Sequence, residues 1–136
     1  MDPVTAGRHA RLGLFYNFYP RAACTVSTCR LYEGYVSSTD GGARWSSPQV
    51  IAGPMRMRML PFAFGYMVGD YEGTAVVPGG RAFSAFAVGG IPAAGQGFNE
   101  AMYEPTGGAA ITGGSRAASA AGARDFAPAR LPGVTR

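Results

Sequence analysis

The chain has no lysine, one histidine and two cysteines, and the shortage of histidine and cysteine removes whole classes of function. Catalysis by Ser-His-Asp or Cys-His groups needs a histidine beside the nucleophile, but His9 lies in an N-terminal segment that we expect to fray. No glycine-rich loop follows a strand and opens a helix, so we expect no nucleotide cofactor, nor any other. No apolar run reaches the roughly 18 residues that cross a bilayer, which predicts no membrane span.

The net charge of +4 lies mostly in the C-terminal part of the chain. Residues 107–136 carry four arginines and one aspartate, whereas residues 1–106 carry eight arginines and seven acidic residues. Residues 1–106 are nearly neutral and so lack the excess of basic residues that binds a phosphate backbone. We therefore expect no nucleic-acid partner. From residue 107 onward the sequence is mostly Gly, Ala, Ser, Pro and Arg, which cannot bury enough apolar surface to offset the ordering entropy. This composition predicts a disordered tail.

Cys24 and Cys29 bracket a short loop between two apolar stretches. A disulfide there would stabilise the fold by roughly 2 kcal/mol on the chain-entropy model, and it implies an oxidising compartment. The alternatives are two free buried thiols or half of a metal site; the metal site lacks further ligands, so we expect no metal. The segment after Met1 has no apolar core of a secretory signal. We therefore expect a fragment of a longer parent protein that is secreted or extracellular.

Residues 38–45, Ser-Thr-Asp-Gly-Gly-Ala-Arg-Trp, follow the pattern S-x-D-x-G-x-x-W and predict a β-hairpin. Asp40 can accept hydrogen bonds from backbone N–H groups in the turn, and Gly42 can take a positive φ. Trp45 can lay its indole across the start of the returning strand. Together with Ser38, these residues shape a turn and perform no chemistry.

The eight residues resemble the Asp-box, a repeat of sialidases and related β-propellers at the turn between the third and fourth strands of a blade. In that family the Asp-box lies at the rim, away from the active site. Residues 67–88 resemble the opening of the next blade in bacterial sialidase-like proteins. The likeness covers roughly two blades, whereas a propeller needs at least about four. It implies an all-β fold of about two four-stranded antiparallel blades of a sialidase-like β-propeller, followed by the disordered tail.

The expected strands are aromatic or alternating stretches bounded by turn residues. They cover residues 11–19, 31–37, 45–52, 68–71, 74–88 as a hairpin turning at 78–80, and 98–103. We expect residues 1–10 to be a disordered N-terminus, residues 11–106 a partial propeller and residues 107–136 the disordered tail, with no helix. Residues 53–66 connect the blades. Their Arg56 and Arg58 belong either to an exposed lip for an acidic sugar or, as we favour, to a buried crossover whose arginines face solvent.

Asp70 and Tyr71 are the catalytic candidates, because the resemblance places them at the end of an innermost strand, which lines the channel where propellers bind ligands. Tyr71 and Glu72 point to opposite faces of a strand and cannot act as one pair, whereas Asp70 and Glu72 share a face. Alternatively, Asp70 serves a turn and Tyr71 packs. Glu100 and Glu104 lie about 13 Å apart along a strand, beyond the roughly 5–10 Å of a glycosidase pair.

The resemblance implies a fragment of a secreted sialidase-like glycoside hydrolase that acts on glycans and is inactive alone. Sialidases clamp the substrate carboxylate with arginines, use a tyrosine nucleophile assisted by a glutamate, and protonate through an aspartate. The Phe/Tyr-Arg-Ile-Pro motif that supplies the first arginine is missing from this sequence. The alternative is therefore a non-catalytic propeller that binds glycan or protein. The expected partners are a glycan and the remaining blades, or another chain that covers the open sheet edge.

Overall fold

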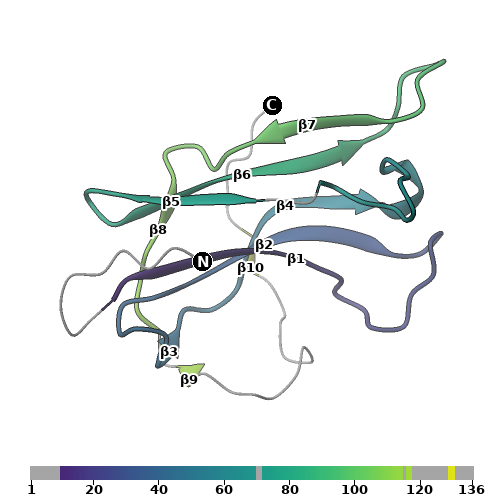
Figure 1. Cartoon of the computed structure of the whole chain (residues 1–136). Coiled ribbons are helices and arrows are strands. Elements are labelled where there is room, and N and C mark those ends of the chain that lie inside the picture. The colour runs from purple at the N-terminus through teal and green to yellow at the C-terminus, as the bar shows by residue number, and fades with distance from the viewer. Residues whose placement is uncertain (1–9, 70–71, 115, 118–128, 131–136) are drawn as a thin grey trace.

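The computed structural model describes residues 10–69, 72–114, 116–117 and 129–130, and this part of the chain consists largely of β-strands (Figure 1). The strands are β1 (Leu12–Phe18), β2 (Arg30–Ser38), β3 (Arg44–Trp45), β4 (Gln49–Arg56), β5 (Gly73–Val77), β6 (Arg81–Gly90), β7 (Asn99–Tyr103), β8 (Ala109–Ala110), β9 (Arg116–Ala117) and β10 (Ala129–Arg130). A single 3-10 turn, η1 (Met57–Met59), follows β4. The all-β class predicted from the sequence is confirmed.

β1, β2 and β4 form an antiparallel sheet, with the short β10 parallel to β4 at its far side. β1 and β2 pair without interruption from Leu12 opposite Ser38 to Phe18 opposite Tyr32. The pairing of β2 with β4 shifts register on both sides of Glu33, which marks a bulge. Because β2 has a partner on each edge, most of its residues are buried.

β5 and β6 form a hairpin in the second sheet, with Val77 paired to Arg81. Its turn lies at residues 78–80, as predicted, and Gly79 and Gly80 have φ angles of 96° and 73°, which favour glycine. On the other edge of β6, β7 pairs with the second half of the strand and β8 with its first two residues. The strand pairs of both sheets are thus antiparallel apart from the short β10, while the assignment of the sheets to propeller blades stays a prediction.

The apolar faces of the two sheets pack against each other in two clusters. The first cluster consists of Phe15, Tyr35, Ile51, Ala52, Ala82, Phe86, Ala109 and Ile111. The second consists of Leu31, Met55 and Leu60. The ring of Phe15 lies 4.7 Å from that of Tyr35 and 6.4 Å from that of Phe86, centroid to centroid. Burial of this apolar surface between the sheets supplies the main favourable free energy of folding.

The strand boundaries differ from the sequence expectation after the first turn. The returning strand β4 extends to Arg56, so the connection to the second sheet begins four residues later than predicted. Pro48 lies between β3 and β4, where a proline interrupts strand pairing because it has no N–H to donate. The strand predicted over residues 68–71 is not seen at residues 68–69, and Asp70 and Tyr71 lie outside the described residues.

Residues 107–114 pack onto the two sheets, which corrects the expectation that disorder begins at residue 107. Ile111 is 7% exposed and belongs to the first cluster, and its N–H donates to the carbonyl of Gly80 at 3.0 Å. The hydroxyl of Ser37 donates to the Thr112 carbonyl at 3.1 Å and accepts from the Thr112 N–H at 3.0 Å. The segment is poor in large apolar residues but finds backbone partners on β2 and at the β5–β6 turn. The predicted boundary between residues 106 and 107 therefore falls inside the packed unit, while residues 1–9, 118–128 and 131–136 lie outside the described part.

The packing of this segment predicts a measurable loss on truncation of its one large apolar side chain. We expect Ile111→Ala to lower the free energy of unfolding by about 2–5 kcal/mol, because it removes buried methylenes and leaves a cavity. Thr112→Ala, at an exposed side chain in the same segment, should change it by less than about 0.5 kcal/mol. Urea denaturation followed by circular dichroism measures both, and equal midpoints for the two variants would contradict the packed segment.

Candidate functional site

The turn between β2 and β3 is held by the hydroxyl of Ser38, which is fully buried. This hydroxyl donates to Asp40 Oδ1 at 2.8 Å and accepts from the N–H groups of Asp40 and Gly42 at 3.3 and 2.9 Å. The backbone N–H of Arg44 donates to the same Asp40 oxygen at 2.8 Å. The bond from Arg44 and then the bond from Ser38 lower the pKa of the Asp40 carboxyl. Asp40 therefore accepts backbone hydrogen bonds within the turn, as the sequence predicts.

Gly42 and Trp45 complete the turn through backbone conformation and packing. Gly42 has a φ of 92°, a conformation that favours glycine. A Cβ placed there would lie 3.4 Å from Leu12 Cδ1 and 3.5 Å from the indole of Trp45, so the ring covers the turn where the chain enters β3. The Ser38 hydroxyl and Asp40 Oδ1 are both engaged within the turn, so the turn is a structural element and ligand chemistry has to be sought elsewhere.

The loop between β1 and β2 is closed by a disulfide between Cys24 and Cys29, which confirms the predicted pairing. Inside the loop the N–H groups of Thr28 and Cys29 both donate to the Thr25 carbonyl, at 2.9 and 2.7 Å. The Thr25 N–H donates to the Thr28 hydroxyl at 2.9 Å. The loop is thus a compact turn fastened at both ends. Disulfides form and persist in oxidising compartments, which is consistent with the extracellular location expected from the sequence.

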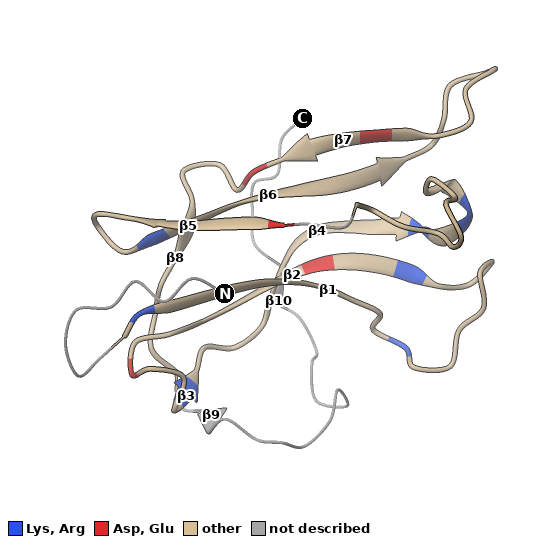
Figure 2. Cartoon of the chain, viewed as in Figure 1, with Lys and Arg blue, Asp and Glu red and all other residues tan. Residues whose placement is uncertain are grey.

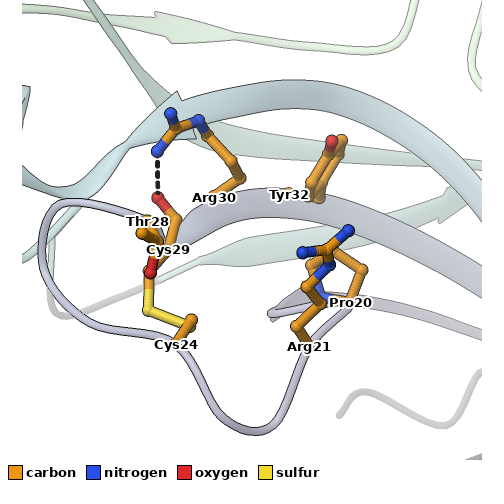
Figure 3. A pocket seen from close by; sticks show the side chains of 7 residues that line it. All are labelled: Pro20, Arg21, Cys24, Thr28, Cys29, Arg30 and Tyr32. Atoms are coloured by element: carbon orange, nitrogen blue, oxygen red, sulfur yellow. Dashed lines mark hydrogen bonds between the residues drawn. A yellow bond between two sulfur atoms is a disulfide. The ribbon is translucent and has the colours of Figure 1, made fainter.

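A pocket of about 240 Å³ lies beside this loop (Figure 3). Its lining residues are Pro20, Arg21, Cys24, Thr28, Cys29, Arg30 and Tyr32. Nη1 of Arg30 donates to the carbonyls of Cys29 and Ser27, at 2.8 and 3.2 Å, which orients the guanidinium at one side of the pocket. Arg21 lies on the other side, near Tyr32 and Pro20 (Figure 3). The pocket is smaller than the roughly 300–1,000 Å³ of drug-sized ligand sites, and it suits one small group.

An aromatic row on the outer face of β1 and β2 leads to this pocket. The rings of Tyr16 and Phe18 lie 5.6 Å apart, and the rings of Phe18 and Tyr32 lie 5.5 Å apart in a stacked arrangement. Tyr32 also lines the pocket. Aromatic faces carry partial negative charge and attract positively polarised C–H groups, such as those on one side of a sugar ring.

The pocket lies at the end of the molecule opposite the Ser38–Asp40 turn, because β2 begins at Arg30 and ends at Ser38. We call the end with the turns at residues 38–45 and 78–80 the turn end, and the end with the loops at residues 19–29, 57–69 and 91–98 the loop end (Figure 1).

Arginines lie at both ends of the molecule (Figure 2). Those in or beside the loops of the loop end are Arg21, Arg30, Arg56 and Arg58, and β2 pairs with β4 so that Arg30 lies opposite Arg56. Residues 19–32 and 41–69 contain no acidic residue, whereas Glu72 and Glu100 lie in the second sheet or just before it. The disulfide loop and the connection after β4 therefore have an electrostatic preference for anions.

A second polar feature lies deeper, between the two apolar clusters. Glu33 is 1% exposed, and within the described residues neither of its carboxylate oxygens has a hydrogen-bond partner. Burial, and then the negative charge of Glu72, raise the pKa of Glu33 from its ordinary value of 4.5 to about 8. Asn17 lies opposite Glu33 in the β1–β2 pairing and donates to Glu72 Oε1 at 2.6 Å. Glu33 therefore carries a proton at neutral pH, and its burial leaves no access for a substrate.

Among the described residues, the acidic groups considered from sequence for catalysis do not line the pocket. Asp70 and Tyr71, the catalytic candidates, lie outside the described residues. Their neighbour Glu72 is exposed at the edge of β5 and has a raised pKa because of partial burial, partly offset by the bond from Asn17. Glu100, on β7, also has a pKa raised by burial.

The connecting loop combines the two alternatives considered from sequence. Arg56 and Arg58 face solvent and Leu60 is buried, as in a packed crossover, but Phe62 and Phe64 are exposed, as in a lip.

Sequence reasoning missed the pocket, although a signal for it was present. Arg21 lies three residues before Cys24, and Arg30 directly follows Cys29, so the two arginines flank the loop that the disulfide closes, and both line the pocket. No pattern in the sequence indicated that Glu33 is buried, because its burial depends on the second sheet, which is distant in sequence.

Comparisons with known proteins leave the chain without assigned relatives. No protein-family model, no curated protein and no solved structure matches it. Among the described residues there is no group of three His, Cys, Asp or Glu side chains that could hold a metal ion. In the same residues, no helix combines the length and the apolarity needed to cross a bilayer.

Removal of the Ser38 hydroxyl should weaken the turn. Ser38→Ala removes the acceptor of the Asp40 and Gly42 N–H groups and one of the two donors to Asp40 Oδ1, and we expect the free energy of unfolding to fall by about 1–3 kcal/mol. Ser47→Ala, at an exposed hydroxyl just after the turn, is the matched control. Guanidinium unfolding monitored by Trp45 fluorescence measures both variants, and a loss no larger than that of the control would show that the hydroxyl does not hold the turn.

The buried carboxyl of Glu33 predicts a stability that falls as the pH rises. Between the ordinary pKa of 4.5 and the folded value of about 8, the unfolded state has released this proton and the folded state still holds it. The contribution of Glu33 to stability therefore decreases by about 1.4 kcal/mol for each pH unit in this window. Glu33→Gln should flatten the profile of unfolding free energy between pH 5 and pH 8, whereas Glu104→Gln, at an exposed edge, should leave the slope in place. A wild-type profile that rises or stays level across this window would contradict the assignment.

Proposed function

We propose that the chain is part of a sialidase-like β-propeller of a secreted glycoside hydrolase that acts on glycans, and that its loop end contacts the glycan. The hydrogen-bonded turn at residues 38–45 supports the scaffold, because its serine, aspartate, glycine and tryptophan all take the roles that the Asp-box pattern requires. The disulfide supports an oxidising location. A scaffold alone does not specify an activity, so the argument for function has to come from the site.

The observation that carries the proposal is the pocket between Arg21 and Arg30. Two arginines and one aromatic residue, Tyr32, line a space that suits one small group. Arginine recognises a carboxylate well because its planar fork donates parallel hydrogen bonds. The aromatic row beside the pocket offers faces for the apolar side of a sugar ring. The site therefore suits a sugar that bears a carboxylate, such as a sialic acid.

The catalytic part of the proposal depends on Asp70 and Tyr71. No acidic residue lines the pocket, so the described residues around it can bind an acidic sugar but cannot transfer a proton to its glycosidic oxygen. Asp70 precedes Glu72, whose carboxylate lies at the edge of the second sheet. In this proposal the remaining catalytic groups come from other blades, and the chain alone binds without hydrolysis.

A non-catalytic glycan-binding propeller is the second candidate. The observation in its favour is the same absence of acids from residues 19–32 and 41–69, which surround the arginines. A binding protein needs the cationic pocket and the aromatic faces and nothing more. The two candidates share the ligand and differ in whether bond cleavage follows.

Binding of an acidic sugar can be measured directly on the purified chain. Titration with N-acetylneuraminic acid should shift the amide resonances of the Cys24–Cys29 loop and of Tyr32 in a ¹⁵N–¹H correlation spectrum. N-acetylglucosamine, which has no carboxylate, should shift them less. We expect Arg21→Gln to weaken binding about tenfold, because a charged hydrogen bond to the carboxylate is lost. Arg44→Gln, at an exposed arginine of the turn end, should bind as the unmodified chain does.

A hydrolysis assay with a fluorogenic sialoside separates the two candidates. The isolated chain should release no fluorophore in either case. A longer chain that contains further blades should release it if the protein is a hydrolase, and should bind without release if it is a binding protein. Equal resonance shifts with the acidic and the neutral sugar, or shifts unaffected by Arg21→Gln, would refute the pocket as a carboxylate site.

A further inference from the structure

The connection between β4 and β5 contains a small projecting hairpin at residues 61–67, which we call the finger. Its base is closed by a β-bridge between Phe62 and Tyr66, whose rings meet edge to face at 5.2 Å between centroids. The Met67 N–H donates to the Pro61 carbonyl at 3.1 Å, and a further backbone bond spans the tip. The finger is thus a defined structural element with its own backbone pairing.

The tip of the finger consists of exposed aromatic side chains. Phe62 is 71% exposed, and Phe64, at the tip, is fully exposed. Phe64 has a φ of 57°, a left-handed conformation that is unfavourable for a bulky residue. By contrast, Leu60 just before the finger is buried against Leu31 and Met55. Folding therefore anchors the base of the finger in the core and leaves two phenylalanine side chains largely exposed to solvent.

Two arginines precede the finger in the sequence. Arg56 and Arg58 are exposed, and residues 41–69 contain no acidic residue, whereas Asp70 and Glu72 follow the finger. The hydroxyl of Tyr19 donates to the sulfur of Met57 at 3.1 Å, which joins the disulfide loop to the same region. The finger is thus an apolar tip whose preceding segment carries two exposed cations.

Apolar side chains of the neighbouring loops extend the same surface. Eight large hydrophobic residues are exposed in the described part of the chain, and six of them lie in the three loops of the loop end (Figure 1). These six are Tyr19, Val26, Phe62, Phe64, Ile91 and Phe98. Scattered exposed hydrophobics need no explanation, but a concentration at one end marks an interaction surface.

We infer that the loop end docks onto an anionic lipid bilayer, with Phe62 and Phe64 inserted at the headgroup level and Arg56 and Arg58 against anionic headgroups. Aromatic rings partition well to the interface between headgroups and acyl chains. Arginines near the surface add electrostatic attraction to anionic lipid. A protein partner would need a groove that matches separate loop tips, whereas a fluid bilayer accepts convex tips from several loops at once. The inference does not depend on the glycan pocket, since the finger contributes no residue to it.

Flotation with lipid vesicles tests this docking. We expect the purified chain to float with phosphatidylcholine vesicles that contain about one third phosphatidylserine, and about tenfold less with phosphatidylcholine alone. The double variant Phe62→Ser/Phe64→Ser should bind at least about tenfold more weakly. Val77→Ser/Met102→Ser removes the two exposed hydrophobics outside the loop end and should bind as the unmodified chain does. Circular dichroism of each variant verifies that the fold is retained.

A fluorescent reporter distinguishes insertion from adsorption. In Phe64→Trp, anionic vesicles should shift the emission to the blue, and lipids with a quencher just below the headgroups should reduce it. Met102→Trp should show neither change beyond the signal of Trp45, which lies at the turn end. Vesicle binding that survives the double phenylalanine substitution would overturn the inference, as would emission from Phe64→Trp that vesicles leave unchanged. The finger would instead belong to a glycan site if N-acetylneuraminic acid shifted its amide resonances and the chain did not bind vesicles. The Arg21→Gln variant should retain vesicle binding, so failure of the pocket and failure of the finger are separate results.

Discussion

The buried hydroxyl of Ser38 fixes the reversal from β2 to β4, and the arrangement of both ends of the molecule depends on that reversal. It occupies two backbone N–H groups and the Asp40 carboxylate at once, which leaves the turn no alternative set of hydrogen bonds. β4 therefore returns beside β2 until Arg56 lies opposite Arg30. Because β1 also runs antiparallel to β2, the disulfide loop reaches the same end. Tight turns lie at one end as a result, and long loops lie at the other.

Glu33 shows how the core accommodates a polar group without a hydrogen-bond partner among the described residues. It lies on the inner face of β2, between Leu31 of one apolar cluster and Tyr35 of the other. Ionisation there would require removing a charge from water without compensation, so the proton is retained and the pKa rises. The nearby carboxylate of Glu72, held by Asn17, adds repulsion and strengthens this effect. The two clusters thus surround a neutral acid and not a buried charge.

Local patterns in the sequence predicted those parts of the fold that local interactions determine. The turn at residues 38–45, the glycine turn at 78–80 and the short disulfide loop each depend on residues within about ten positions of one another. The packing of residues 107–114 could not be predicted in this way, because Ile111 gains its environment from strands far away in sequence. The same holds for the burial of Glu33. The cationic pocket was within reach of sequence reasoning, since its two arginines flank the cysteines.

The exposed phenylalanines of the finger show a different kind of departure from sequence expectation. A run of apolar residues after β4 favoured a buried crossover, and Leu60 fulfils that expectation. The following residues form their own small hairpin, which the bridge between Phe62 and Tyr66 closes before the chain reaches the second sheet. The hydrophobic content of the finger therefore predicted that its side chains are buried. Their position is determined instead by backbone pairing within the finger.

The bond between Cys24 and Cys29 makes the pocket sensitive to the redox potential of its surroundings. Cys24 and Cys29 both line the pocket, and the carbonyl of Cys29 holds the guanidinium of Arg30. Reduction would remove the covalent link in this wall, and the loop would then depend on its internal hydrogen bonds alone. A thiol reductant added for storage would therefore loosen the wall of the pocket while it leaves the two sheets intact.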